Sequence, residues 1–457
     1  MRSWIKSTLA VLLLFGVCWT GAIWYWRDTN RMPSSADLLL FMLALPFALL
    51  LAFWLGRKLL ALAAAAAPVA VNAAPANTAA PAQQAAPALS LLAAALRTPH
   101  GASTEELAGA IEGQKARASL DPELVDDSGF PLMSARAPEA GDAAARDEIA
   151  QWLAANGHAD ASFSDEQWRS ILLAGAVATD LAYPAASHGH LPVAEGAPQP
   201  PLLQLIVLLP AGWTETQRLP LLAWLRHTVA RCGWPLERIS ASAPAQAAPA
   251  ATLTQLARHG QTSGEPVLAM VLACGSTIGE ASVNALRASL FGANRPHGII
   301  PGEGAAGLLV ADTTQAALIE TGPQPQLSSA AGMRDGSADQ SGRPDAATLR
   351  KLAAHLLDSA AIGAASVALV LSDADHRTSR VMEVMALAEG ALPHLDTATD
   401  VQATGTACGH CGAVPWLAAL ALARHAAVGR GQPVLALGVD DPHYRSAALV
   451  RPPAAQS

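Results

Sequence analysis

Cysteine and charged side chains are scarce in this chain. Its 457 residues include five cysteines, which are too few and too scattered for a disulfide scaffold and fit a reducing compartment. Charged residues make up 14% of the sequence, and the formal net charge is −8. Because no basic surface is available to bind phosphates, we expect no nucleic-acid partner.

Motifs that mark several enzyme classes are also missing. No Walker-type phosphate-binding loop occurs, and the nearest string to a Gly-x-Ser-x-Gly elbow, GQTSG at residues 260–264, has Thr in the middle. The sequence holds one CxxC pair, Cys408 and Cys411. Cys232 and Cys274 are isolated, so four zinc ligands would have to meet by chance proximity. We therefore expect no metal and no cofactor.

Apolar residues make up 51% of the chain and are concentrated near its N-terminus. Residues 8–26 and 38–55 are each apolar enough for a spanning helix, which predicts a transmembrane helical hairpin over residues 1–60. Cations flank the outer ends of this hairpin: Arg2, Lys6, Arg57 and Lys58. The positive-inside rule therefore places both ends, and the large domain, in the cytoplasm. A cleaved signal peptide is the alternative for the first run, but the length of that run and the presence of a second one argue against it.

The rest of the chain is predicted to be an α/β domain behind a tether. Residues 61–88 form an Ala/Pro-rich linker that cannot build a core. Beyond it, apolar runs alternate with helical patterns, as in α/β folds. The predicted strands cover residues 202–209, 267–273, 305–311, 365–371, 434–439 and 447–450. The predicted helices cover residues 148–155, 168–181, 216–231, 280–291, 346–357, 379–389 and 414–427.

The predicted domain has two halves. Residues 313–344 are rich in Gly, Ser, Pro and Gln and are expected to form a surface excursion between them. This divides the domain into residues 89–335 and 336–457.

A glycine-rich turn, Gly302-Glu303-Gly304, stands directly before one of these strands. The glycines let the chain turn sharply into a sheet. We expect a structural turn in which the Glu303 carboxylate binds backbone donors. Since Gly-x-Gly turns have many uses, the motif alone identifies no function.

Two further groups of residues could carry chemistry. Cys408 and Cys411, with His410 between them, have the spacing of a dithiol redox centre at a helix N-terminus, and a glycine-lined helix entrance is the structural alternative. The other group follows a predicted strand, where α/β folds place active sites: Asp373, Asp375, His376 and Glu383. Solvated loop charges are the alternative for this second group.

Three stretches, in this order, resemble the thiolase and β-ketoacyl synthase superfamily: GIIPGEGAAGLLVAD (298–312), VLSDADHRTSRVMEV (370–384) and GTACGHCGAVPWLAALALA (405–423). The start of the domain, AAALRTPHGAS (93–103), is similar to the superfamily's first strand and loop. The resemblance implies an α/β, thiolase-like layered fold of two halves, here preceded by the transmembrane hairpin. It matches His410 to the histidine of the superfamily's Gly-His turn, whereas His376 stands where related sequences carry a small or amide residue.

One feature of that superfamily is missing. Its acyl chemistry needs a cysteine thiolate at a helix N-terminus before the strand that here begins at Val267. This chain has ISASAPAQAAPAA there (239–251), without cysteine, and Ser240 or Ser242 would be a weak substitute without an adjacent base. The Ala and Pro content also predicts that no firm helix start forms there. We therefore interpret the domain as a pseudoenzyme whose surface is available for binding.

The whole architecture of hairpin, linker and degenerate thiolase-like domain resembles the type VI secretion lipase-adapter family of bacteria. The resemblance implies a non-catalytic adapter, held in the inner membrane, that binds a phospholipase effector in the cytoplasm and helps load it on a VgrG-type spike protein. Thiolase-like domains commonly dimerise, so a homodimer is also expected. The alternative is a membrane-tethered acyl-transfer or thiol-dependent enzyme. Its candidate catalytic residues would be Cys408, His410, Cys411, His376 and Asp373.

Six tryptophans are candidates for a partner surface, because aromatic anchors dominate protein interfaces. They are Trp152, Trp168, Trp213, Trp224, Trp234 and Trp416. Most fall in apolar helical patterns, which predicts that they belong to the core.

Overall fold

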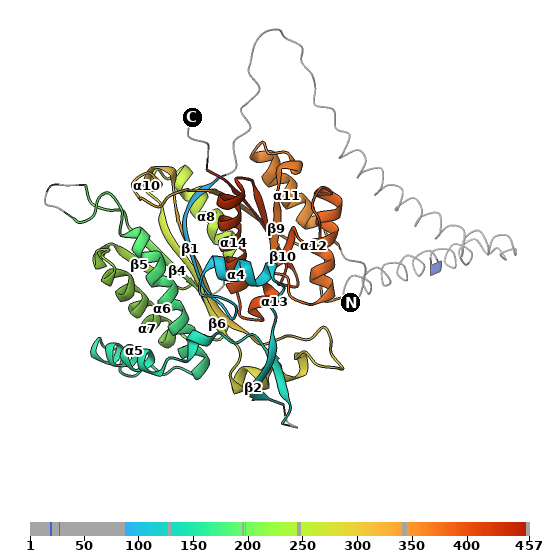
Figure 1. The fold of residues 1–457 in the computed structure, drawn as a ribbon, viewed down its shortest axis with the longest axis horizontal. Helices are drawn as coiled ribbons and strands as arrows, with labels where there is room; N and C mark the ends of the chain where they lie inside the picture. The colour runs from blue at the N-terminus through green and yellow to red at the C-terminus, as the bar shows by residue number, and fades with distance from the viewer. Residues whose placement is uncertain are drawn as a thin grey trace, which may run out of the picture. The chain divides into compact units, whose positions relative to one another are not determined.

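The structure, a computed structural model, describes residues 87–126, 129–193, 196, 198–244, 248–340 and 345–453, together with Trp19, Thr20 and Arg27. The predicted spans at 8–26 and 38–55 and nearly all of the linker lie outside the described residues. Within the described part of the chain, no helix combines the length and apolar character needed to cross a bilayer. The chain divides into two compact units, residues 1–81 and 82–457. The second unit holds every element labelled in Figure 1.

A sheet of ten strands forms the centre of residues 82–457. Its spatial order is β10-β9-β11-β12-β8-β1-β7-β6-β4-β5. The first five large strands in the chain are β1 (Leu89–Arg97), β4 (Leu203–Leu208), β5 (Ile239–Ser242), β6 (Leu268–Ser276) and β7 (Glu303–Ala311). The next five are β8 (Gln326–Met333), β9 (Leu369–Ser372), β10 (Val401–Ala403), β11 (Val434–Gly438) and β12 (Tyr444–Arg451).

The two sets of five strands have the same topology. From the outer edge inward, each set reads third, second, fourth, fifth and first strand in chain order. The sets meet where β1 and β8 pair antiparallel, through Leu89 with Leu327 and Ser90 with Gln326. The domain is therefore two copies of one strand arrangement joined at their first strands, and the second copy begins with β8.

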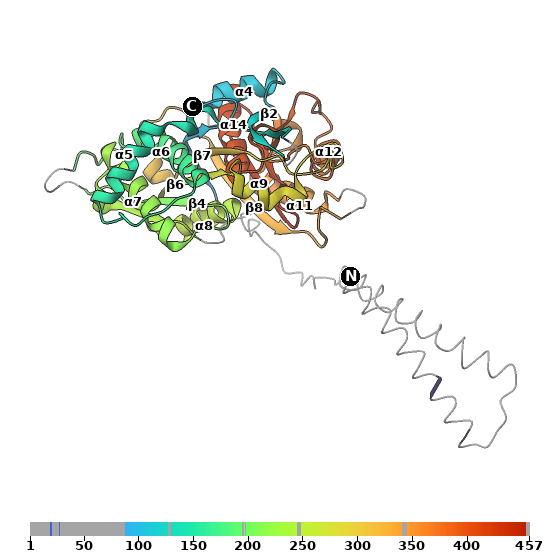
Figure 2. The same cartoon turned by 90° about the horizontal axis from the view of Figure 1, so that it is seen from below.

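Helices cover both faces of each half. The α-helices are α4 (Thr104–Glu112), α5 (Ala143–Ala155), α6 (Asp165–Ala185), α7 (Glu215–Arg231), α8 (Pro249–Thr262), α9 (Glu280–Leu286), α10 (Thr313–Ala316), α11 (Ala347–Ser359), α12 (Thr378–Ala391), α13 (Gly405–Cys408) and α14 (Val414–Arg430). Short 3-10 turns lie at η2 (Pro138–Gly141), η3 (Leu236–Arg238), η4 (Arg287–Ser289) and η5 (Ala364–Ser366). Figures 1 and 2 show α5, α6 and α7 on one side of the domain and α11 and α12 on the other, with α14 between them.

Three hydrophobic cores follow from this layering. Strand residues alternate between them: in β6, Val271 and Ala273 face the middle core, whereas Met270 and Leu272 face the core under α6 and α7. Helix α14 is buried along most of its length because it contacts strands of both halves. A third core lies under α11 and α12. The layers of sheet and central helix are thus built from period-two apolar patterns.

All six predicted strands are present, and so are the seven predicted helices, although 280–291 ends early as α9 and η4. The predicted surface excursion at 313–344 is wrong, because it contains β8, a central strand of the sheet. Its sequence, QLSSAAGM, has little apolar character. It is a strand because β12 pairs with its whole length and β1 with its start.

The tryptophans are mostly core, as predicted. Five of the six are buried, with exposures between 2% and 8%: Trp168, Trp213, Trp224, Trp234 and Trp416. Trp152 of α5 is partly exposed and stacks on His227, with ring centroids 4.4 Å apart.

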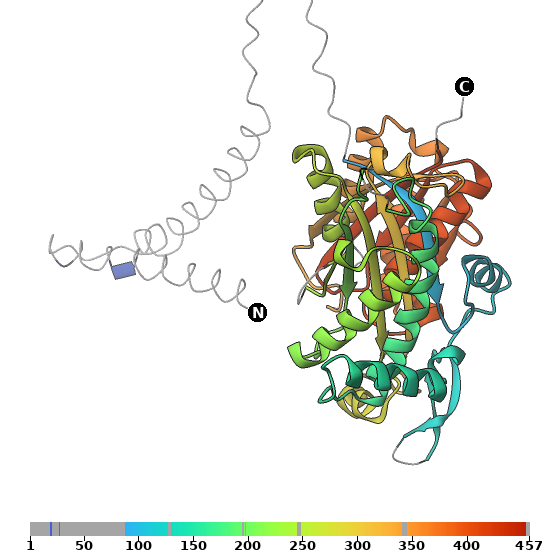
Figure 3. The ribbon, with the colours of Figure 1, turned by 90° about the vertical axis from the view of Figure 1, so that its left-hand side faces the viewer.

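A small hairpin stands apart from the large sheet. Its strands are β2 (Ser119–Val125) and β3 (Pro131–Ser134). Figure 3 shows the hairpin, in cyan and teal, extending from the body of the domain. A satellite cluster of Leu124, Val283 and Leu290 packs it against the α9 region.

Candidate functional site

Glu303 is completely buried at the first position of β7, and its partners tie structural elements together. Arg169 of α6 donates to both carboxylate oxygens, with Nη2 2.6 Å from Oε1 and Nε 2.7 Å from Oε2. The Ala137 N–H donates to Oε1 at 2.8 Å, and the Ser276 hydroxyl donates to Oε2 at 3.0 Å. This carboxylate joins β7 to α6 and β6. Its saturation with donors leaves it little capacity to bind a ligand.

The turn of Gly302 and the turn of Cys408 pack backbone against backbone. The His410 N–H donates to the Ile300 carbonyl at 2.9 Å, and Thr277 Oγ1 donates to the His410 carbonyl at 2.6 Å. A Cβ atom on Gly302 would lie 2.0 Å from the Cys408 carbonyl oxygen. Only glycine fits there, and the interlocked turns fix the backbone that carries His410.

Three of the four described thiols are buried inside the domain. Cys408 and Cys411 have no exposed surface, and Cys274 has 1%. Burial raises the pKa of Cys408 and of Cys274 to about 12, and burial also raises the pKa of Cys411 well above its usual value. Cys411 Sγ donates to the Cys408 carbonyl at 3.5 Å. Neutral buried thiols of this kind are poor nucleophiles, because the thiolate is the reactive form.

The place where the superfamily resemblance expects a nucleophile is the connection from β5 to α8. Residues 243–248, between these elements, read APAQAA and contain neither cysteine nor serine. Ser240 and Ser242 lie on β5 with exposed side chains. The prediction that no firm helix starts here is wrong: α8 begins at Pro249, and proline at the first helical position is favourable because its missing N–H would be unpaired there anyway.

Asp373 and Glu383 have internal partners. Asp373 Oδ1 accepts from the N–H groups of Val439 and Asp440, at 2.6 and 3.2 Å. Burial and the neighbouring Asp440 carboxylate raise the pKa of Asp373 to about 7, although the two N–H donors oppose the shift. Glu383 is buried and pairs with Arg445, with N–O distances of 2.8 and 2.9 Å.

Asp375 and His376 are partly exposed. The Asp375 carboxylate accepts from Arg377 Nε at 2.7 Å, so its charge is paired. His376 packs edge-on against Phe291, with ring centroids 5.1 Å apart, and its buried Nε2 has no hydrogen-bond partner among the described residues.

A cavity of about 720 Å³ brings two of the predicted histidines together. His376 and His410 both line it, and so does Asp375. Cys408, Cys411, Asp373 and Glu303 are not among its lining residues. The cavity therefore unites His376 with His410, and no described thiol lines it.

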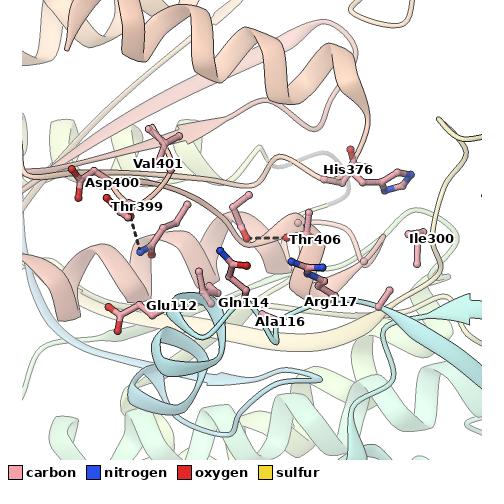
Figure 4. Close-up of a pocket in the computed structure, with 18 of the residues that line it drawn as sticks. Glu112, Gln114, Ala116, Arg117, Ile300, His376, Thr399, Asp400, Val401 and Thr406 are labelled. Carbon is pink, nitrogen blue, oxygen red and sulfur yellow. Dashed lines mark hydrogen bonds between the residues drawn. The ribbon is translucent and has the colours of Figure 1, made fainter. Parts of the chain in front are cut away.

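Two walls of this cavity were not expected from the sequence. One consists of the end of α4 and the segment after it: Ile111, Glu112, Gln114, Ala116, Arg117 and Ala118. The other is residues 398–403, which include β10, and continues to Gly405 and Thr406. Figure 4 shows Asp400 and Val401 on one side, Glu112 and Gln114 on the other, and His376 at the far end. One signal for α4 was present, since Ser103 and Glu106 have the spacing of a capping box. Ser103 Oγ accepts from the Glu106 N–H, and the Glu106 carboxylate accepts from the Ala102 N–H.

Solved structures with a similar fold are ketosynthases. The ketosynthase from module 6 of the bacillaene synthase from Bacillus subtilis 168 gives a TM-score of 0.54 at 11% identity, over 81% of this chain and 73% of that chain. The ketosynthase from module 1 of the bacillaene synthase from Bacillus amyloliquefaciens FZB42 gives 0.53 at 13% identity, over 82% and 75%. The ishigamide ketosynthase/chain length factor gives 0.52 at 17% identity, over 80% and 99%.

The domain has a thiolase-like fold. The structural similarity and the repeated strand order both carry this conclusion, and they confirm the predicted layered α/β architecture. No family model matches the sequence, and no curated protein matches it. At identities below 20%, the likeness to ketosynthases concerns the fold of this thiolase-like domain and does not extend to its chemistry.

Proposed function

We propose that this protein is a non-catalytic adapter that binds a phospholipase effector in the cytoplasm and helps load it on a VgrG-type spike protein. The observation that carries the proposal is the connection from β5 to α8. Acyl transfer on a thiolase-like fold needs a nucleophile before that helix, and residues 243–248 provide no cysteine or serine. In the proposed adapter, the catalytic step is lost while the folded scaffold is retained.

Two further features support a binding role. The thiols in the described part of the domain are either buried or, for Cys232, held at the end of α7 with a pKa raised by burial. The Ala/Pro-rich linker at 61–88 would let a membrane-held domain search for its partner at raised effective concentration. Recognition of a folded partner needs a surface of roughly 800 Å² on each side and no catalytic group.

The test uses the full chain purified in detergent together with a candidate phospholipase encoded near it. We expect a stable complex on size-exclusion chromatography, and an unchanged intact mass after incubation with an acyl thioester. A matched experiment with a phospholipase of unrelated origin controls for nonspecific capture. Failure to retain the cognate phospholipase, or an acyl adduct on any cysteine of the folded protein, would overturn the proposal.

A second candidate function is an acyl-transfer or thiol-dependent enzyme. One observation favours it: His376, His410 and Asp375 line the same cavity, so acid–base groups stand together in a space large enough for a small substrate. This candidate predicts turnover of an acyl thioester that His410→Ala and Cys411→Ser abolish. If the wild-type chain releases no thiol from such substrates, this candidate is wrong.

A further inference from the structure

Strand β10 leaves one edge of the large sheet unpaired. It is the last strand in the sheet order and pairs only with β9, in parallel. Asp400 accepts from Val370, and Thr404 donates to Ser372, so alternate residues of this stretch bond to β9. The residues between them, Val401 and Ala403, therefore direct their N–H and C=O groups to the other side.

That free edge faces the cavity. Residues 398–403 form one continuous wall of it, and within this wall the three residues of β10, at about 3.3 Å per residue, span roughly 10 Å. Thr406 Oγ1 donates to the Ala403 carbonyl at 3.2 Å. Among the described residues, no hydrogen bond reaches the outward N–H of Val401 or of Ala403.

The opposite wall is a loop that follows α4. After α4 ends at Glu112, residues 115–118 run without helix or strand pairing until β2 begins at Ser119. Figure 4 shows Gln114 and Ala116 on this wall, across the cavity from Val401. A chain laid between the walls would thus have an unpaired sheet edge on one side and the side chains of Gln114, Ala116 and Arg117 on the other.

Some charged side chains of the groove are close to an opposite charge, and others are not. Asp400 is near Arg430, with 3.8 Å between Oδ1 and Nη1, and Asp375 pairs with Arg377. Arg117 and Glu112 line the groove with exposed side chains, and neither has an ion-pair partner in the described part of the chain. In Figure 4, Glu112 lies toward the Asp400 end and Arg117 toward the His376 end.

We propose that the groove between β10 and residues 114–118 binds an extended peptide segment of a partner protein, which adds a strand to the free edge of β10. The segment carries an acidic side chain for Arg117 and a basic one for Glu112, a few residues apart. Main-chain hydrogen bonds to Val401 and Ala403 supply affinity, and the two charges fix direction and register. This inference deepens the adapter function and rests on it for the identity of the partner.

Two probes test the inference in the full chain in detergent. One is the cognate phospholipase; the other is a displayed library of random peptides of about 12 residues, selected on the immobilised protein. With either probe, we expect hydrogen–deuterium exchange to slow at the amides of Val401 and Ala403. Selected peptides should be enriched in an acidic residue a few positions from a basic one.

Four variants test whether the peptide binds in the groove beside β10. Ala118→Arg fills the groove without touching the sheet and should weaken binding by roughly tenfold or more. Ser240→Arg, on the opposite sheet edge at β5, is the matched control and should leave binding unchanged. Val401→Pro removes an outward N–H, which an edge strand tolerates, and should weaken binding to a similar extent. The Arg117→Glu variant should no longer bind the peptides that carry an acidic residue at that position. Binding should recover when the acidic residue of the peptide is changed to lysine.

Each outcome decides between the proposals. If the phospholipase binds but neither probe protects Val401 and Ala403, and Ala118→Arg binds normally, the peptide groove is wrong and the adapter function stands. If the phospholipase does not bind but selected peptides protect the edge, the effector assignment is wrong and the groove stands. Protection that rises with protein concentration alone, without a probe, would show a second copy on β10 and would overturn the inference.

Discussion

Arg169 and Glu303 form a two-point ion pair, in which the Glu303 carboxylate has no exposed surface and the Arg169 side chain is 13% exposed. Two unpaired charges at this depth would be costly, and the pair is held by further donors from Ala137 and Ser276. Glu303 of the glycine-rich turn therefore stabilises the contact between β7 and α6. We therefore attribute the glycine-rich motif around Glu303 to the stability of the fold more than to a reaction.

Replacing Glu303 by Gln should destabilise the domain strongly. The change leaves the Arg169 charge without its partner, which in buried pairs costs about 3–5 kcal/mol. Urea unfolding followed by tryptophan fluorescence measures the loss. Asp165→Asn removes the exposed pair of Asp165 with Arg146 and is the control, with an expected cost under about 1 kcal/mol. Equal costs for the two variants would contradict the structural role of Glu303.

Gly302→Ala should disrupt the contact between the two turns. A methyl group 2.0 Å from the Cys408 carbonyl oxygen forces the backbone apart, and overpacking of this kind costs roughly 1–3 kcal/mol. We expect a lower Tm and chemical-shift changes at His410. Gly109→Ala, in the middle of α4 with nothing within 4 Å of the added atom, is the matched control and should be neutral or slightly stabilising. A Tm for Gly302→Ala equal to that of the wild type would show that the turns are not interlocked.

The sequence predicted those parts of the fold that apolar patterning determines. Strands β6 and β7 are continuous apolar runs between helices, which is how strands buried on both faces look. The strands that the sequence did not reveal, β5 (ISAS), β8 and β10 (VQA), are short or rich in small polar residues. They are strands because of their partners, and pairing between distant segments cannot be read from local periodicity.

The residues of the candidate site also fall into those that the sequence predicted and those that it did not. His376 and His410 were predicted one by one, from motifs on either side of β10. The cavity they share also needs Arg117 and Glu112, which are nearly 300 residues earlier in the chain. No local signal connects segments so far apart, whereas the capping-box spacing of Ser103 and Glu106 would have predicted α4 itself.

The buried thiols should react slowly with alkylating reagents. Cys408, Cys411 and Cys274 are almost fully buried, and burial raises the pKa of each, so alkylation requires local opening of the fold. At pH 7.5 we expect iodoacetamide labelling, resolved by peptide mass spectrometry, to be slower than in urea by roughly two orders of magnitude or more. Partly exposed Cys232 is the internal comparison and should label faster. Rapid labelling of Cys411 in the folded protein would restore the thiol-enzyme hypothesis.

Asp373 should make stability fall as the pH rises from about 4 to 7. Its pKa is about 7 in the folded protein and 3.8 without the fold, because burial and Asp440 disfavour the charged carboxylate. In this window the folded state holds a proton that the unfolded state has released, so each pH unit removes at most about 1.4 kcal/mol of stability. Above pH 7 both states are ionised and the effect is constant. Asp373→Asn keeps the oxygen that accepts from Val439 and Asp440 but cannot ionise, so its stability relative to the wild type should increase between pH 4 and pH 7. Urea unfolding of both proteins at matched pH values measures this difference, and Asp358→Asn, on the surface of α11, is the control expected to show no such trend. A pH-independent difference between Asp373→Asn and the wild type would mean that Asp373 is ionised throughout the range.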